Sequence, residues 1–92
     1  MKKVWISYCT EHEFGQRDDG YMVSDDLEAM NTKIKENESQ GNREQYWSYS
    51  TPMEVWCNKK TYEKIMEKKN NNHNYNIAFY GNREKLKLYK KI

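Results

Sequence analysis

Cysteine and histidine, the usual ligands of structural zinc, are scarce in this chain, which has two of each among its 92 residues. Zinc binds such side chains tetrahedrally, so Cys9, His12, Cys57 and His73 are the candidate ligands. Cys9 and His12 have a short ligand spacing, whereas Cys57 and His73 lack one. We therefore expect two reduced thiols and no metal or other cofactor, with a zinc site as the alternative.

Nucleophilic catalysis would need Cys9 as a thiolate and His12 as its base. The carboxylates of Glu11 and Glu13 oppose this role, because a nearby negative charge raises the pKa of a thiol. The sequence also lacks the motifs G-x-S-x-G and H-E-x-x-H and any glycine-rich phosphate-binding loop. We expect that this protein is not an enzyme.

A small metal-independent nuclease is the weaker alternative. Its acid–base groups would have to converge on one phosphate. The candidate residues for this chemistry are His12, Arg17, His73, Tyr80 and Arg83. Their spacing in the sequence gives no indication of such convergence.

Charge is unevenly distributed along the chain. Residues 1–46 contain six Lys/Arg and ten Asp/Glu, whereas residues 47–92 contain ten and four. An acidic segment accounts for most of the first-half acids and consists of Glu11, Glu13, Asp18, Asp19, Asp25, Asp26 and Glu28. We expect it to dock on a basic surface of a partner protein, since complementary charge steers association. The alternative is a solvated loop followed by acids that favour a helix N-terminus.

Lysines and tyrosines alternate near the C-terminus. The residues that could contact nucleic acid there are Tyr80, Arg83, Lys85, Lys87, Tyr89 and Lys91. Tyrosine rings can stack on bases while lysines contact phosphates. Lysines on an edge strand also prevent edge-to-edge aggregation, which is the simpler interpretation. Nucleic-acid binding is therefore the alternative function.

The first elements that would hold these side chains are a strand and a helix. Residues 3–9 alternate with a period of two and predict a strand, and the polar residues 10–20 predict a loop. Ser24 is a suitable N-cap for a helix that ends near Gly41. The apolar stripe of this helix consists of Leu27, Met30 and Ile34.

The middle of the chain predicts an interrupted strand and a second helix. Residues 46–57 are strand-like, but Pro52 cannot donate a ladder hydrogen bond. This pattern indicates an edge strand, a bulge, or two short strands around a turn. Asn58 is a suitable cap for the second helix, whose inward face carries Tyr62, Ile65 and Met66.

The C-terminal residues predict a hairpin. Gly81-Asn82 is a good two-residue turn between two alternating segments. In this register Ile77 faces Leu86 and Tyr75 faces Leu88, so apolar side chains of both strands share one face.

Taken together, the elements have the order β-α-β-α-β-β. This order indicates an α+β fold, with a small, largely antiparallel sheet and two helices packed on one face. We expect residues 1–92 to form a single domain. The predicted core residues are Val4, Ile6, Leu27, Ile34, Tyr62, Ile65, Ile77, Leu86 and Leu88.

The composition fits a small domain with an aromatic core. Apolar residues make up 36% of the chain, charged residues 33% and aromatic residues 14%, with a formal net charge of +2. No apolar run approaches the ~20 residues that a membrane helix needs, and the N-terminus lacks the apolar stretch of a secretion signal. We expect no membrane contact and a cytoplasmic location in the producing or infected cell.

Lysine and asparagine dominate the sequence while alanine and leucine are scarce, as is typical of coding from an AT-rich genome. With the small size and the missing catalytic motifs, this composition resembles that of accessory proteins of bacteriophages and mobile elements. The resemblance implies a non-enzymatic binding protein that binds and blocks a host protein, here through the acidic segment.

Overall fold

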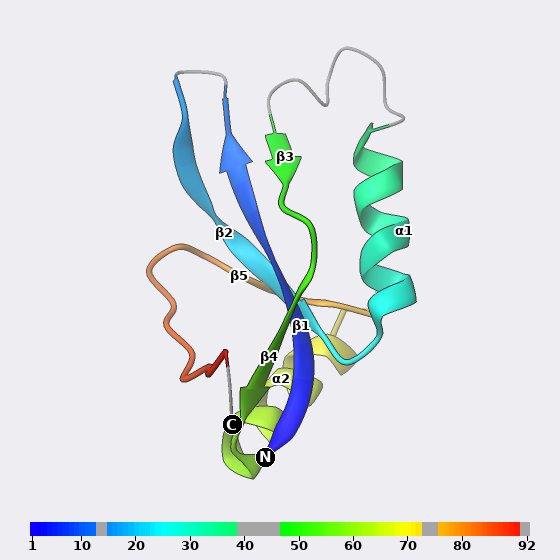
Figure 1. The fold of residues 1–92 in the computed structure, drawn as a ribbon, viewed down its shortest axis with the longest axis vertical. Helices are drawn as coiled ribbons and strands as arrows, with labels where there is room; N and C mark the ends of the chain where they lie inside the picture. The colour runs from blue at the N-terminus through cyan, green and yellow to red at the C-terminus, as the bar shows by residue number, and fades with distance from the viewer. Residues whose placement is uncertain (13–14, 39–46, 73–75, 91–92) are drawn as a thin grey trace.

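The computed structural model describes residues 1–12, 15–38, 47–72 and 76–90. These residues form two helices and five strands (Figure 1). The elements are β1 (Lys2–Glu11), β2 (Arg17–Ser24), α1 (Leu27–Glu38), β3 (Trp47–Tyr49), β4 (Met53–Cys57), α2 (Lys59–Asn70) and β5 (Ala78–Tyr80). The strands pair antiparallel in one sheet, which confirms the predicted α+β fold. The predicted order of elements roughly matches, but it lacked β2 and had an additional strand after β5.

β1 and β2 form a long hairpin in which Glu11 pairs with Arg17 near the turn (Figure 1). The predicted loop over residues 10–20 is therefore wrong for most of its length. Residues 17–19 are exposed, so this part of β2 lacks the apolar alternation by which a strand is recognised in a sequence. Both strands are central, since the sheet order is β3-β1-β2-β5 and β4 also pairs with β1.

β3 and β4 follow each other along one edge of β1, and Pro52 lies between them. Ser50 bridges the interruption: Ser7 Oγ donates to the Ser50 carbonyl at 2.5 Å, and the Tyr8 N–H donates to Ser50 Oγ at 2.8 Å. Of the three predicted alternatives, the structure therefore has two short strands, β3 and β4, with Pro52 between them.

α1 begins two residues later than predicted, at Leu27. The side chain of Asp26, and not that of Ser24, accepts a hydrogen bond from the Ala29 N–H, at 3.1 Å. This backbone bond and then the amide of Asn76 hold the pKa of Asp26 below its usual value. Ser24 Oγ instead accepts from the Asp26 N–H and donates to the Asn76 carbonyl. The predicted helix end at Gly41 lies outside the described residues.

α2 begins as predicted. Asn58 Oδ1 accepts a hydrogen bond from the Thr61 N–H at 2.8 Å, which satisfies one of the free donors of the first turn. On the inward face of α2, Ile65 is fully buried, and Tyr62 and Met66 are half-buried against the same core.

The two helices contact opposite faces of the sheet, whereas the sequence predicted one shared face. Ile6 and Val23 belong to the same buried cluster as Ile65 of α2. Met22 belongs to a second cluster with Met30 of α1. Because neighbouring side chains of a strand point to opposite faces, Met22 and Val23 bury both faces of β2. The prediction lacked β2, the strand that has buried side chains on both faces, and therefore placed both helices on one face.

The predicted C-terminal hairpin is not formed. β5 pairs with β2, with Ala78 opposite Val23. Ile77 packs in the α1 cluster and Leu86 against the α2 cluster, so the two do not face each other. Tyr75, predicted to form the second pair, lies outside the described residues. β2 offers β5 a buried apolar partner strand, which the lysine-rich tail does not.

The C-terminal tail (residues 81–90) crosses the α2 face of the sheet instead. Leu86 and Leu88 pack partly buried on the α2 cluster. At its far end, Tyr89 forms two backbone hydrogen bonds with Trp56 of β4, of 2.7 and 2.8 Å. The tail therefore covers a core face without forming a strand.

The core prediction was correct in part. The confirmed residues are Val4, Ile6, Ile65 and Ile77. The residues that are only half-buried are Leu27, Ile34, Tyr62, Leu86 and Leu88. The main buried residues absent from the prediction are Met22, Val23, Met30, Val55, Cys57 and Ala78.

Candidate functional site

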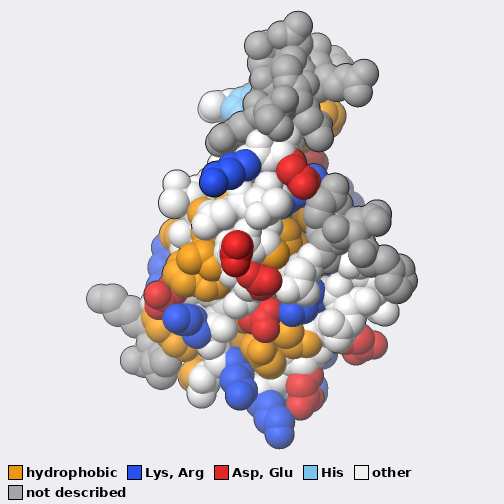
Figure 2. All heavy atoms as spheres, turned by 90° about the vertical axis from the view of Figure 1, so that its right-hand side faces the viewer, with side chains coloured by type: hydrophobic (Ala, Val, Ile, Leu, Met, Phe, Trp, Pro, Cys, Tyr) orange, Lys and Arg blue, Asp and Glu red, His pale blue; other side chains and the backbone are white. Residues whose placement is uncertain are grey.

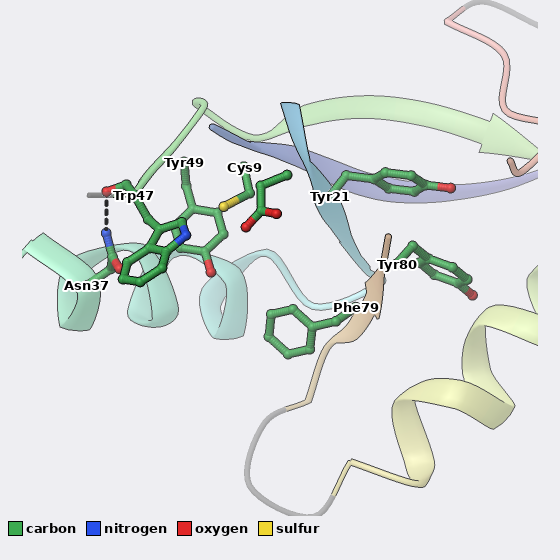
Figure 3. Close-up of a pocket in the computed structure, with 8 residues that line it drawn as sticks. Cys9, Tyr21, Asn37, Trp47, Tyr49, Phe79 and Tyr80 are labelled. Atoms are coloured by element: carbon green, nitrogen blue, oxygen red, sulfur yellow. Dashed lines mark hydrogen bonds between the residues drawn. The ribbon is translucent and has the colours of Figure 1, made fainter. Parts of the chain in front are cut away.

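A pocket of about 310 Å³ lies between the sheet and α1 (Figure 3). This α1 pocket is lined by Cys9, Asp19, Tyr21, Asn37, Trp47, Tyr49, Phe79 and Tyr80. Figure 3 shows Trp47, Tyr49 and Phe79 on the α1 side of the sheet, whereas Tyr21 and Tyr80 point away. The α1 pocket thus combines three aromatic rings with a carboxylate, an amide and a thiol.

The pairing of the strands places these aromatic side chains. Tyr49 pairs with Cys9 in the β1–β3 ladder, and Trp47, two residues earlier, therefore shares its face. On β5, Phe79 pairs with Met22, whose side chain packs under α1. Tyr49 and Phe79 are partly buried against this same cluster. The inner wall of the α1 pocket is therefore continuous with the core beneath α1.

Trp47 forms the outer wall of the α1 pocket. Its side chain is 40% exposed, more than those of Tyr49 and Phe79. The Asn37 Nδ2 group donates to the Trp47 carbonyl at 3.2 Å, as the dashed line in Figure 3 marks. This bond joins the last turns of α1 to β3, so the two sides of the pocket are tied together.

A β-bulge directs Asp19 into the α1 pocket. Tyr8 pairs with Tyr21 and Thr10 pairs with Asp18, which leaves Cys9 opposite two residues, Asp19 and Gly20. Gly20 has a φ of +94°, as glycine often does in bulges. Because of the extra residue, Asp18 faces the α2 side and Asp19 the α1 side of the sheet.

The charges near the α1 pocket affect the pKa of the Cys9 thiol. Burial, and after it the carboxylate of Asp19, raises the pKa of Cys9. A hydrogen bond from Tyr49 and the charge of Lys33 lower this pKa by smaller amounts. The thiol therefore keeps its proton at neutral pH and is a poor nucleophile. His12, its predicted base, bonds to a serine hydroxyl of β3 at 2.9 Å.

Several acids of the acidic segment have partners within the fold. Glu11 is buried and forms an ion pair with Arg17 at 2.5 Å. Asp25 forms an ion pair with Lys69 of α2 at 2.7 Å. Asp26 caps α1. These carboxylates stabilise the fold and contribute little to a free acidic surface.

The remaining described acids lie on different faces. Asp18 lines a second pocket of about 250 Å³ on the α2 side. Asp19 lines the α1 pocket, and Glu28 is exposed on α1. Glu36, which was not part of the predicted segment, is also exposed on α1. Figure 2, which looks onto the α1 side, shows acidic side chains among basic and hydrophobic ones. Glu13 lies outside the described residues.

The lysine–tyrosine residues do not share a sheet face, because the tail is not a strand. The buried ring of Tyr80 stacks on Tyr21, with centroids 5.3 Å apart, and Lys68 Nζ lies 4.0 Å from the ring centroid. Tyr89 is 43% exposed. The exposed basic residues of the tail are Arg83, Lys85, Lys87 and Lys90. Lys91 lies outside the described residues.

Among the described residues, the candidate metal ligands are not brought together, and the nuclease candidates Arg17 and Tyr80 lie apart. Cys57 is buried on the α2 side of the sheet and Cys9 lines the α1 pocket, so the two thiols cannot bind one ion. His73 is outside the described residues, among which no His, Cys, Asp and Glu side chains group as a metal site. Arg17 lies four residues from Tyr21, the partner of Tyr80, a separation of roughly 13 Å along a strand.

No protein-family model matches this chain, and comparison with curated proteins and with solved structures finds no significant match. In the part of the chain that the structure describes, no helix is long and apolar enough to cross a membrane.

The aromatic residues of the α1 pocket were not predicted from the sequence. Trp47 and Tyr49 alternate in a strand-like segment, which was a usable signal for a shared face. Phe79 was assigned to a hairpin that is not formed. Of the predicted docking residues that the structure describes, Asp19 is the one that lines this pocket.

Proposed function

We propose that this protein is a non-enzymatic binding protein and that it docks on a protein partner through the α1 surface, which we define as the α1 pocket with Glu28 and Glu36. The α1 pocket carries this proposal, because it presents Trp47, Tyr49 and Phe79 around an accessible concave site. Tryptophan and tyrosine are enriched among the residues that dominate binding energy at protein interfaces.

The construction of the α1 pocket supports this role. Tyr49 and Phe79 are fixed against the core, and Asn37 joins α1 to β3 beside Trp47. Rigid aromatic side chains contribute contact area at a low cost in conformational entropy. Asp19 adds a negative charge, so we still expect the partner to have a basic surface.

Nucleic-acid binding has less support from the contacts. Tyr21 stacks on the Tyr80 ring and Lys68 lies over it, so this ring is already engaged within the fold. The basic residues Arg83, Lys85 and Lys87 lie on the tail, on the opposite side of the sheet from the α1 pocket.

The test compares exposed aromatic residues on the two faces. The wild-type protein, immobilised, captures the partner from a lysate of the source cells, and Kd is then measured with the purified partner by titration calorimetry. Trp47→Ala should weaken binding by about 2 kcal/mol or more. Tyr8→Ala is the matched control, since Tyr8 is 47% exposed on the other face, and it should bind like the wild type.

A charge variant tests the alternative. The double substitution Lys85→Glu and Lys87→Glu should leave partner binding nearly unchanged. The proposal would be overturned if the wild-type protein captured nucleic acid and salt weakened this binding steeply. The binding would also have to be lost in the double variant and retained in Trp47→Ala.

A further inference from the structure

The carboxylate of Asp19 shares the α1 pocket with the three aromatic rings, and this combination determines what the pocket can receive. Aromatic faces attract cations through their quadrupole, and a carboxylate attracts them through its charge. An apolar side chain would fill the space but would leave Asp19 without a partner from the guest. A cationic group is therefore the better complement.

The sign of the local potential agrees with this conclusion. At Cys9, inside the α1 pocket, the effect of Asp19 exceeds the opposing effect of Lys33 on α1. The described charges around the pocket thus favour a positive guest over a negative one, although Lys33 reduces the preference.

We propose that the α1 pocket receives an arginine side chain of the protein partner, with its guanidinium group stacked on the aromatic rings and hydrogen-bonded to Asp19. This assignment rests on the proposed function. A guanidinium group is planar and weakly hydrated, stacks on aromatic faces and pairs with a carboxylate through two parallel bonds. Asn37 donates through Nδ2 to Trp47, so its Oδ1 atom can accept a further bond from the guest.

The ligand test uses capped amino acids with the whole protein, observed by the indole N–H signals in NMR spectra. N-acetyl-arginine methylamide should shift the Trp47 signal with a Kd in the millimolar range and leave the signals of Trp5 and Trp56 unchanged. The citrulline analogue has the same shape without the charge and should bind roughly tenfold more weakly. Equal binding of the two probes would overturn the arginine assignment.

Two neighbouring acids give a matched pair of variants. Asp19→Asn should weaken binding of the capped arginine by roughly tenfold. Asp18→Asn removes the same charge on the other side of the sheet and should have no effect. Equal effects of the two variants would show a general influence of charge and would also overturn the assignment.

The partner distinguishes this inference from the proposed function. If Trp47→Ala abolishes partner binding but Asp19→Asn does not change it, the arginine assignment is wrong and the docking proposal stands. If neither variant changes partner binding, the docking proposal fails and the arginine assignment fails with it. If both variants weaken binding and an arginine of the partner is needed, both are supported.

Discussion

Replacement of Gly20 by alanine should strongly destabilise the fold. Gly20 occupies the bulge of β2 with a φ of +94°, a conformation that side chains rarely adopt. A Cβ atom there would overlap the carbonyl oxygen of Tyr80, and it would lie 3.2 Å from both the Tyr80 carbonyl carbon and Gly81 Cα. These obstacles are backbone atoms, so β5 itself would have to move away from β2.

The magnitude follows from two contributions. The strained backbone costs about 1–3 kcal/mol, and the displacement of tightly packed neighbours costs a similar amount, about 1–3 kcal/mol. Together they give about 2–6 kcal/mol, a large share of the roughly 5–14 kcal/mol expected for a domain of this length. Because β5 carries Phe79, the same variant should also weaken binding of the capped arginine in the α1 pocket.

Gly15→Ala is the control, because Gly15 has a similar φ of +96° with nothing within 4 Å of its Cβ position. It should cost only the backbone strain of about 1–3 kcal/mol. Urea unfolding followed by tryptophan fluorescence measures both variants. Equal losses of stability in Gly15→Ala and Gly20→Ala would refute the overlap with Tyr80.

Three further results are expected. Asp19→Asn should lower the pKa of Cys9, because the Asp19 carboxylate raises it, and should therefore speed alkylation of this thiol by iodoacetamide at about pH 8. Mass spectrometry measures the rate, and the buried Cys57 should react only after unfolding. An unchanged rate at Cys9 would contradict the charge effect. Asp26→Ala should cost about 0.5–2 kcal/mol at neutral pH through loss of the helix cap, whereas Asp26→Asn should cost less. Since the pKa of Asp26 is lowered in the fold, its contribution is present above about pH 4 and is lost as the pH falls through the lowered pKa, so urea unfolding in acid should show a smaller difference between Asp26→Ala and wild type. Ile77→Ala should cost about 2–5 kcal/mol in the same assay because Ile77 is fully buried under α1, and a loss below about 1 kcal/mol would contradict this burial.

The features that were predicted correctly depend on residues that are close together in the sequence. Asn58 caps α2 through a side-chain bond three residues away, and Pro52 interrupts the edge strand because it has no N–H. Neither effect requires knowledge of what packs against the segment. Such local chemistry was sufficient to identify both helices and the broken strand.

The C-terminal hairpin shows where local chemistry was insufficient. A turn does form there, since the Glu84 N–H donates to the Gly81 carbonyl at 3.1 Å. The partner of β5, however, is chosen by competition between the tail and β2. β2 was not predicted, because Arg17 to Asp19 are exposed and polar while Met22 and Val23 are buried on opposite faces. Because β2 was not predicted, β5 was assigned the wrong partner strand.

The docking surface depends on the same strand. Asp18 and Asp19 are adjacent in the sequence and were expected to act together, yet they face opposite sides of the sheet. In a hairpin without the bulge, the register set by Tyr8 and Tyr21 would pair Asp19 with Thr10 and turn it toward α2. The extra residue at the bulge reverses this assignment and places Asp19 beside the aromatic rings. Gly20, which allows the bulge, is thus the sequence feature that determines which carboxylate the α1 pocket contains.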